Sequence, residues 1–119
     1  METLHILITD DETEMRRAVE RALRDFTIRL PDVNLDVNFS LETAGTGEEA
    51  LEKIEARRPD IILLDYKLPG ISGLDVLEKV TKKDGDIHTV MMTAYASLET
   101  AVTATKQGAF DFIAKPFTP

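Results

Sequence analysis

Four consecutive large aliphatic residues, 61–64, end directly at the carboxylate of Asp65. An uninterrupted apolar run of this length is typical of a central parallel strand that is covered on both faces. A carboxylate without a partner at the end of such a strand would carry a large desolvation penalty. We therefore expect Asp65 to have a functional role. The same run is far too short to span a membrane.

Strand-like and helix-like patterns alternate along the chain. The spacing of apolar residues predicts strands over residues 4–9, 35–42, 61–64, 90–92 and 110–114. Helices are predicted between them, over residues 15–26, 46–58, 72–80 and 97–108. This alternation predicts an α/β fold, with a doubly wound, five-stranded parallel sheet and helices on both of its faces.

Residues 27–38 interrupt this regular pattern. Ile28 and Leu30 are expected to prolong the first helix by about a turn, and Pro31 then ends it. The alternating strand that follows is expected to lie at an edge of the sheet, where extra length is tolerated. The segment is therefore predicted to be a peripheral extension outside any functional site.

Composition restricts the class of protein. The 119 residues correspond to one domain, residues 1–119. With 22 acidic and 14 basic side chains the net charge is −8, which argues against direct nucleic-acid binding because the phosphate backbone would repel the chain. There is no cysteine, which excludes disulfides and fits a cytoplasmic protein. The first residues lack the features of a signal peptide, so no membrane association is expected.

Polar side chains follow the predicted strands, and in parallel sheets ligands bind at that edge. Five residues occupy such positions: Asp10, Asp11, Asp65, Thr93 and Lys115. Three carboxylates in one small region require a cation to offset their charge. Mg²⁺ fits, because it takes one or two carboxylates and retains several waters. Asp10 and Asp11 taken alone fit a helix N-cap equally well.

The same residues fit phosphoryl chemistry. A carboxylate can act as the nucleophile on phosphorus and form an aspartyl phosphate. Such a reaction needs a metal, a lysine and a hydroxyl donor to offset charge, which Lys115 and Thr93 could complete around Asp65. Ala94 is small and leaves room beside Thr93 for a phosphoryl group. Taken singly, Thr93 is also typical of a turn at the end of a strand. Lys115 taken singly is typical of a side chain in contact with solvent. The two histidines, His5 and His88, are interpreted as structural.

Four segments, in this order, resemble the receiver domains of two-component response regulators. They are ILITDDE (6–12), IILLDYKLPG (61–70), MTA (92–94) and GAFDFIAKPF (108–117). The resemblance implies a flavodoxin-like sheet with strand order 2-1-3-4-5. It also implies a sensor histidine kinase as phosphodonor and an output domain in the same or another chain. The last segment is most similar to receivers of the nitrogen-regulator type and of some hybrid kinases.

The resemblance also assigns roles to single residues. Asp65 would accept the phosphoryl group. Asp11, Asp65 and the backbone carbonyl of Lys67 would bind Mg²⁺. Asp10 would act through a metal-bound water or orient Asp11.

The remaining roles concern phosphoryl binding and the switch. Thr93 would hydrogen-bond one phosphoryl oxygen and Lys115 would pair with another. Thr93 and Phe112 would form the conformational switch. Such a domain catalyses its own phosphorylation and dephosphorylation, although it is mainly a signalling switch.

Two features depart from the family pattern. Asp11 and Asp65 are 54 positions apart, which is longer than usual, and the excess lies around residues 27–38. The chain also ends at Pro119, before the last helix that receivers normally have, so we expect a truncated receiver. A homodimer is compatible with the resemblance, but the usual dimer face would involve that helix.

Other classes of protein are alternatives to a phospho-accepting receiver. A degenerate receiver that binds partners without phosphorylation is the main one. A nucleotide-binding domain or a flavodoxin-like electron carrier would need a phosphate-binding turn where Asp10 and Asp11 stand. An Asp-x-Asp phosphohydrolase would need a second acid at position 67, which is Lys67 here.

Overall fold

A computed structural model describes residues 2–24, 28–30, 35–83, 86–93, 106, 108–109 and 111–114. Six strands and three helices are seen there: β1 (Glu2–Thr9), α1 (Thr13–Arg24), β2 (Ile28–Leu30), β3 (Leu35–Ala44), α2 (Gly47–Ala56), β4 (Ile61–Asp65), α3 (Gly73–Lys83), β5 (His88–Thr93) and β6 (Asp111–Ala114). The predicted helix over residues 97–108 falls almost wholly outside the described residues. None of the helices that the structure describes is both long and apolar enough to cross a membrane.

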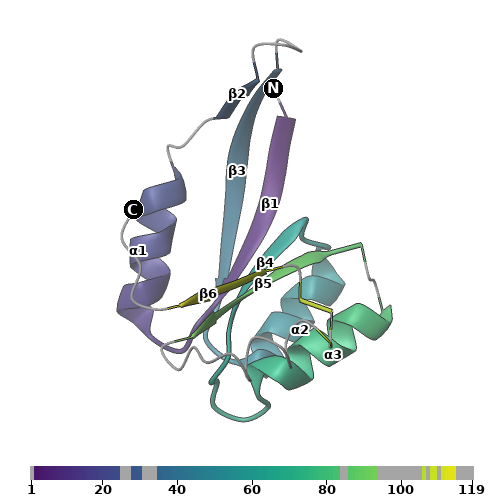
Figure 1. Cartoon of the computed structure of the whole chain (residues 1–119). Helices are drawn as coiled ribbons and strands as arrows, with labels where there is room; N and C mark the ends of the chain where they lie inside the picture. The colour runs from purple at the N-terminus through teal and green to yellow at the C-terminus, as the bar shows by residue number, and fades with distance from the viewer. Residues whose placement is uncertain are drawn as a thin grey trace.

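The strands form one sheet in the order β2-β3-β1-β4-β5-β6. The five strands β3, β1, β4, β5 and β6 are parallel to one another. Without β2, their order is the predicted 2-1-3-4-5. Figure 1 shows α1 on one side of the sheet and α2 and α3 together on the other. The doubly wound α/β fold is thereby confirmed.

The extra strand β2 shows that the predicted extension of the first helix was wrong. Ile28 and Leu30 do not prolong the first helix, because α1 ends at Arg24 and Ile28–Leu30 pairs antiparallel with β3. Leu30 precedes Pro31, which disfavours helical backbone at Leu30, and pairing with β3 supplies the hydrogen bonds that an extended backbone needs. As a result β2, and not β3, is the edge strand on this side of the sheet.

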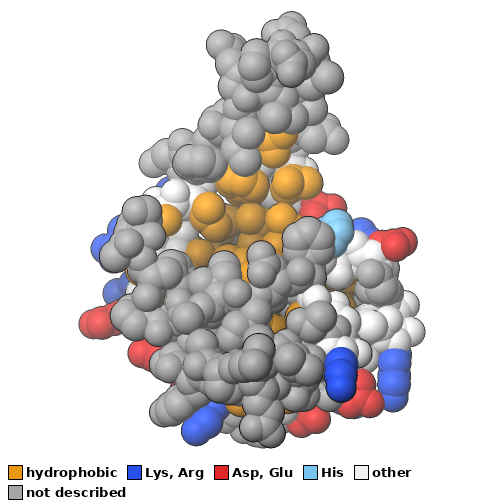
Figure 2. Space-filling model, in the orientation of Figure 1, with side chains coloured by type: hydrophobic (Ala, Val, Ile, Leu, Met, Phe, Trp, Pro, Cys, Tyr) orange, Lys and Arg blue, Asp and Glu red, His pale blue; other side chains and the backbone are white. Residues whose placement is uncertain are grey.

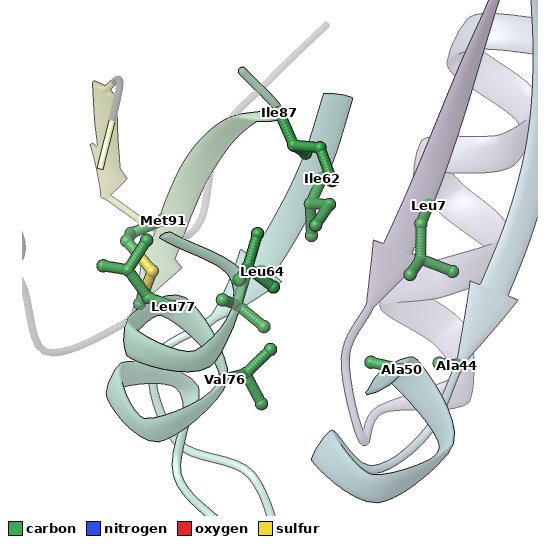
Figure 3. Packing of buried hydrophobic residues seen from close by; sticks show 10 residues of the cluster. Leu7, Ala44, Ala50, Ile62, Leu64, Val76, Leu77, Ile87 and Met91 are labelled. Carbon is green, nitrogen blue, oxygen red and sulfur yellow. The ribbon is translucent and has the colours of Figure 1, made fainter. Parts of the chain in front are cut away.

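Each face of the sheet has its own apolar cluster. The larger cluster lies between the sheet and the α2–α3 pair and includes Leu7, Ile62, Leu64, Leu77 and Met91. Figure 3 shows side chains from β4, β5 and α3 of this cluster pointing toward one another. β4 is covered on both faces, as predicted. Ile62 and Leu64 are fully buried in the larger cluster, and Ile61 and Leu63 pack against the cluster on the opposite face.

The smaller cluster lies on the α1 side, and its buried members among the described residues are Ile6, Ile8 and Val19. Partly buried apolar residues surround it, among them Phe39 and Leu41 of β3. Figure 2 shows hydrophobic side chains gathered over β1 and β3, beside α1. The two clusters hold β1 and β4 between them, and the acidic residues of the site lie at the carboxyl ends of these strands.

His5 lies in β1 with 5% of its surface exposed, and its Nε2 is 3.0 Å from Glu42 Oε2 on β3. Its backbone N–H donates to the Asp60 carboxylate at 2.8 Å. These contacts join β1 to β3 and to the residue that precedes β4, away from the acidic residues, which agrees with a structural role for His5.

Candidate functional site

Asp10 and Asp65 lie at the carboxyl edge of the parallel sheet. Thr9 of β1 is opposite Leu64 of β4, so Asp10 and Asp65 are the next residues along two adjacent strands. Asp10 has no exposed surface and Asp65 has 5%. Two nearly buried carboxylates at the ends of adjacent strands agree with the predicted location of the site.

Asp11 and Glu12 extend the acidic group into solvent. One carboxylate oxygen from each of Asp10, Asp11 and Glu12 lies within 4.8 Å of the other two. Such a set of oxygen donors suits a hard cation such as Mg²⁺, which would also offset the repulsion between like charges. Glu12 was not among the predicted ligands, although its place directly after Asp11 was a signal for it.

The turn between β1 and α1 orients this group. The Asp10 carboxylate accepts a hydrogen bond from Glu12 N at 2.9 Å, and the Arg16 guanidinium donates to the Asp10 carbonyl at 2.6 Å. Asp10 therefore orders the turn before α1, but this bond is not the predicted N-cap, because Glu12 precedes Thr13, the first residue of α1. By contrast, the Asp11 carboxylate has no hydrogen-bond or ion-pair partner in the part of the chain that the structure describes. Asp11 is exposed to solvent at this edge of the sheet.

A cavity of about 550 Å³ opens beside Asp11. Its other walls come mainly from the loop between β4 and α3, including Lys67 and Ser72. The structure thus brings two of the predicted metal-binding residues, Asp11 and Lys67, to one cavity next to the end of β4.

Backbone hydrogen bonds hold both ends of this loop. Tyr66 N donates to Met92 O of β5 at 2.8 Å, and Gly73 N donates to Tyr66 O at 3.0 Å. At the start of α3, Ser72 and Asp75 cap each other's backbone N–H groups at 3.2 Å.

Gly73 leaves no room for a side chain. A Cβ atom at this position would lie 2.1 Å from the Asp65 carbonyl oxygen and 2.9 Å from that of Tyr66. The first residue of α3 is therefore packed directly on the backbone of Asp65. Glycine is required here because of this close approach.

A capping box is present at the start of α2, with one change from the usual pattern. Thr46 Oγ1 accepts from Glu49 N at 3.1 Å. The Glu49 carboxylate accepts from Gly45 N at 2.7 Å, one residue before the expected donor. Glu48 precedes Glu49, and its carboxylate accepts a hydrogen bond from Ile71 N in the β4–α3 loop at 2.9 Å.

The structure tests the other predicted residues less fully. Thr93 is the last residue of β5, one position beyond Met92, which pairs with Asp65. Phe112 lies in β6 opposite Met91. The side chains of Thr93 and Phe112, and all of Ala94 and Lys115, lie outside the described residues. Their roles stay predictions.

Comparison with known proteins identifies the class. Residues 6–119 match the sequence profile described as "Response regulator receiver domain". The Regulatory protein LuxO of Vibrio cholerae serotype O1 is 46% identical over 87 residues, which cover 73% of this chain and 18% of LuxO. The DNA-binding transcriptional regulator NtrC of Klebsiella pneumoniae is 34% identical over 110 residues, which cover 92% of this chain and 21% of NtrC.

A solved structure shows the same fold. It is a response regulator protein from Burkholderia pseudomallei with a phosphorylated aspartic acid, calcium ion and citrate. It is 27% identical, has a TM-score of 0.79, and the match covers 97% of this chain and 61% of that one.

The chain belongs to the response regulator receiver domain family. Within that family, its similarity to LuxO and NtrC supports the nitrogen-regulator-like character suggested by residues 108–117. The chain spans about a fifth of the length of these two relatives.

Proposed function

We propose that residues 1–119 form a phospho-accepting receiver domain in which Asp65 is the phosphorylated residue. The observation that carries this proposal is the position of Asp65. It is nearly buried at the end of β4, adjacent to Asp10 and close to the loop that shares a cavity with Asp11. The phosphorylated aspartic acid in the Burkholderia pseudomallei relative supports the same chemistry here.

The phosphodonor would be the phosphohistidine of a sensor histidine kinase. A carboxylate oxygen of Asp65 attacks phosphorus, the P–N bond breaks, and its electron pair stays on the imidazole nitrogen, which then takes up a proton. The product is an aspartyl phosphate. Later attack of water on phosphorus releases inorganic phosphate and restores the Asp65 carboxylate, so the domain catalyses both steps on itself.

The acidic residues would hold Mg²⁺, with the carboxylates of Asp11 and Asp65 and the carbonyl of Lys67 as ligands. Asp10 would orient Asp11 through the turn before α1. When bound, Mg²⁺ neutralises negative charge on the phosphoryl oxygens. Without a cation, the carboxylates of the site would repel the incoming phosphoryl group.

Signal output would depend on the residues at the ends of β5 and β6. Thr93 would donate its hydroxyl to a phosphoryl oxygen, Lys115 would pair with another, and Phe112 would change its packing in response. An output domain would read this change, in the same chain or another. Similarity to NtrC, a DNA-binding transcriptional regulator, favours a regulator of transcription as the whole protein. In that case DNA would be bound by the output domain. A cytoplasmic location is part of this proposal.

A small phosphodonor tests the proposal without the kinase. With Mg²⁺ and acetyl phosphate, the wild type should gain one acid-stable, base-labile phosphoryl group by mass spectrometry. Asp65→Asn should gain none, whereas Asp86→Asn, which changes an exposed aspartate just before β5, should behave like the wild type. An unchanged signal in Asp65→Asn would place the nucleophile elsewhere. A wild type that binds a kinase but takes no phosphoryl group would be a degenerate receiver.

A further inference from the structure

Glu48 reaches from the first turn of α2 to the loop between β4 and α3. Its Oε1 accepts a hydrogen bond from Ile71 N at 2.9 Å. A Cβ atom at Gly70 would lie 2.6 and 2.7 Å from the two carboxylate oxygens, so the Glu48 carboxylate rests directly against the Gly70 backbone. Gly70 has φ +77°, a conformation that glycine adopts without steric cost. The loop is therefore shaped around the Glu48 carboxylate.

The β4–α3 loop lines the cavity beside Asp11. Lys67, whose carbonyl is a proposed Mg²⁺ ligand, lies three residues before Gly70 and lines the same cavity as Asp11. The loop ends are held by backbone contacts with β5 and within the loop itself. Glu48 adds an attachment for its second half, from a helix that contributes no proposed ligand.

We propose that Glu48 is a positioning residue, which holds the β4–α3 loop so that the Lys67 carbonyl and the Asp11 carboxylate face one cation. The inference rests on the proposed function and adds to it a residue outside the phosphorylation site. A ligand-binding loop that is already ordered does not lose conformational entropy on binding. Loss of one charge-assisted hydrogen bond at an exposed position changes such an equilibrium by about two- to tenfold.

The hydrogen bond must be separated from the charge of Glu48, because a negative charge near the site would also attract Mg²⁺ through space. Glu48→Gln keeps an oxygen acceptor for Ile71 N and removes the charge. Glu48→Ala removes both. Glu52→Ala is the matched control, since Glu52 is exposed on the same helix and carries the same charge but has no hydrogen-bond or ion-pair partner among the described residues.

The first measurement uses the Mg²⁺-free protein. Hydrogen exchange of the Ile71 amide, followed by NMR, should be about two- to tenfold faster in Glu48→Ala than in the wild type. Glu48→Gln and Glu52→Ala should stay close to the wild type. Equal exchange in wild type and Glu48→Ala would show that the contact does not order the loop, and the inference would fail. If Glu48→Ala does not fold, Glu48→Met, which keeps the length of the side chain without a carboxylate acceptor, takes its place.

The second measurement is a Mg²⁺ titration of the same proteins, followed by the Lys67 and Asp11 amide resonances. Glu48→Ala should bind Mg²⁺ about two- to tenfold more weakly than the wild type, with most of the affinity retained in Glu48→Gln. Wild-type affinity in Glu48→Ala, or equal losses in the Ala and Gln variants, would overturn the positioning role. A wild type that does not bind Mg²⁺ would overturn the proposed function itself, so the two failures are distinguishable.

Discussion

Replacing Gly73 by alanine tests the packing of α3 against the candidate phosphoacceptor. The new Cβ would lie 2.1 Å from the Asp65 carbonyl oxygen, and contacts below 3.0 Å are essentially never observed. The start of α3 and the end of β4 must therefore move apart by at least 0.9 Å, the difference between these two distances. Because the obstacle is backbone, a change of side-chain rotamer cannot relieve it.

The energetic cost follows from this displacement. α3 contributes the buried side chains of Val76, Leu77 and Val80 to the larger apolar cluster, and they would shift with the helix. Forcing extra volume into a packed region typically costs about 1–3 kcal/mol. The substitution of glycine by alanine restores about 0.4–1 kcal/mol by restricting the unfolded chain. The expected net loss in the free energy of unfolding is about 1–2 kcal/mol.

Urea denaturation measures this loss directly. The midpoint of Gly73→Ala should fall by roughly 0.5–1 M relative to the wild type. Gly45→Ala is the matched control, because its Cβ would meet a side chain, the Arg16 guanidinium at 3.3 Å, which needs to shift by only a few tenths of an ångström, and its midpoint should fall much less. Acetyl phosphate should also modify Asp65 more slowly in Gly73→Ala. Equal midpoints for the two alanine variants would refute the steric argument.

Three further predictions concern the site and its surroundings. Asp11→Asn should weaken Mg²⁺ binding at least tenfold in an NMR titration, because it removes a direct carboxylate ligand; no response of the wild type at millimolar Mg²⁺ would remove the metal from the mechanism. A deletion that shortens residues 27–38 and still folds should be phosphorylated at the wild-type rate, and a large loss of phosphorylation would contradict a peripheral role. With beryllofluoride as a phosphoryl mimic, resonances should shift from Thr93 to Phe112, and Thr93→Ala should suppress the distant shifts while retaining those beside Asp65.

The sequence predicted the parts of the fold that depend on local pattern. The apolar run 61–64 is β4 in the middle of the sheet, and the helix predicted over residues 72–80 is α3. The edge of the sheet that carries the acidic residues was also predictable, because strand ends in a parallel sheet share one edge. Asp10 and Asp65 accordingly follow paired residues of adjacent strands.

The parts that sequence reasoning missed depend on contacts between distant segments. Ile28–Leu30 is too short to show a periodicity of its own, and its extended conformation follows from pairing with β3. Glu48 belongs to the first turn of α2, where an acidic residue is explained by the helix dipole alone. Its bond to Ile71 spans 23 positions and depends on the path of the loop, which local propensity does not determine.

The long pairing between β1 and β3 keeps changes in strand length away from the residues of the candidate phosphorylation site. These strands pair over eight positions, from Glu2 opposite Val37 to Thr9 opposite Ala44, whereas β1 pairs with β4 over only the last four. The ladder therefore projects beyond β4 at the end remote from the carboxyl edge, where β2 is added (Figure 1).

At a rise of about 3.3 Å per residue, the four additional pairs extend the ladder by roughly 13 Å. The register at the carboxyl edge is fixed by the shared pairs from Ile6 to Thr9, so residues gained or lost at the far end leave Asp10 and Asp65 aligned. This end of the domain is a suitable position for inserting a reporter or an epitope, because the insertion would leave the phosphorylation chemistry untouched.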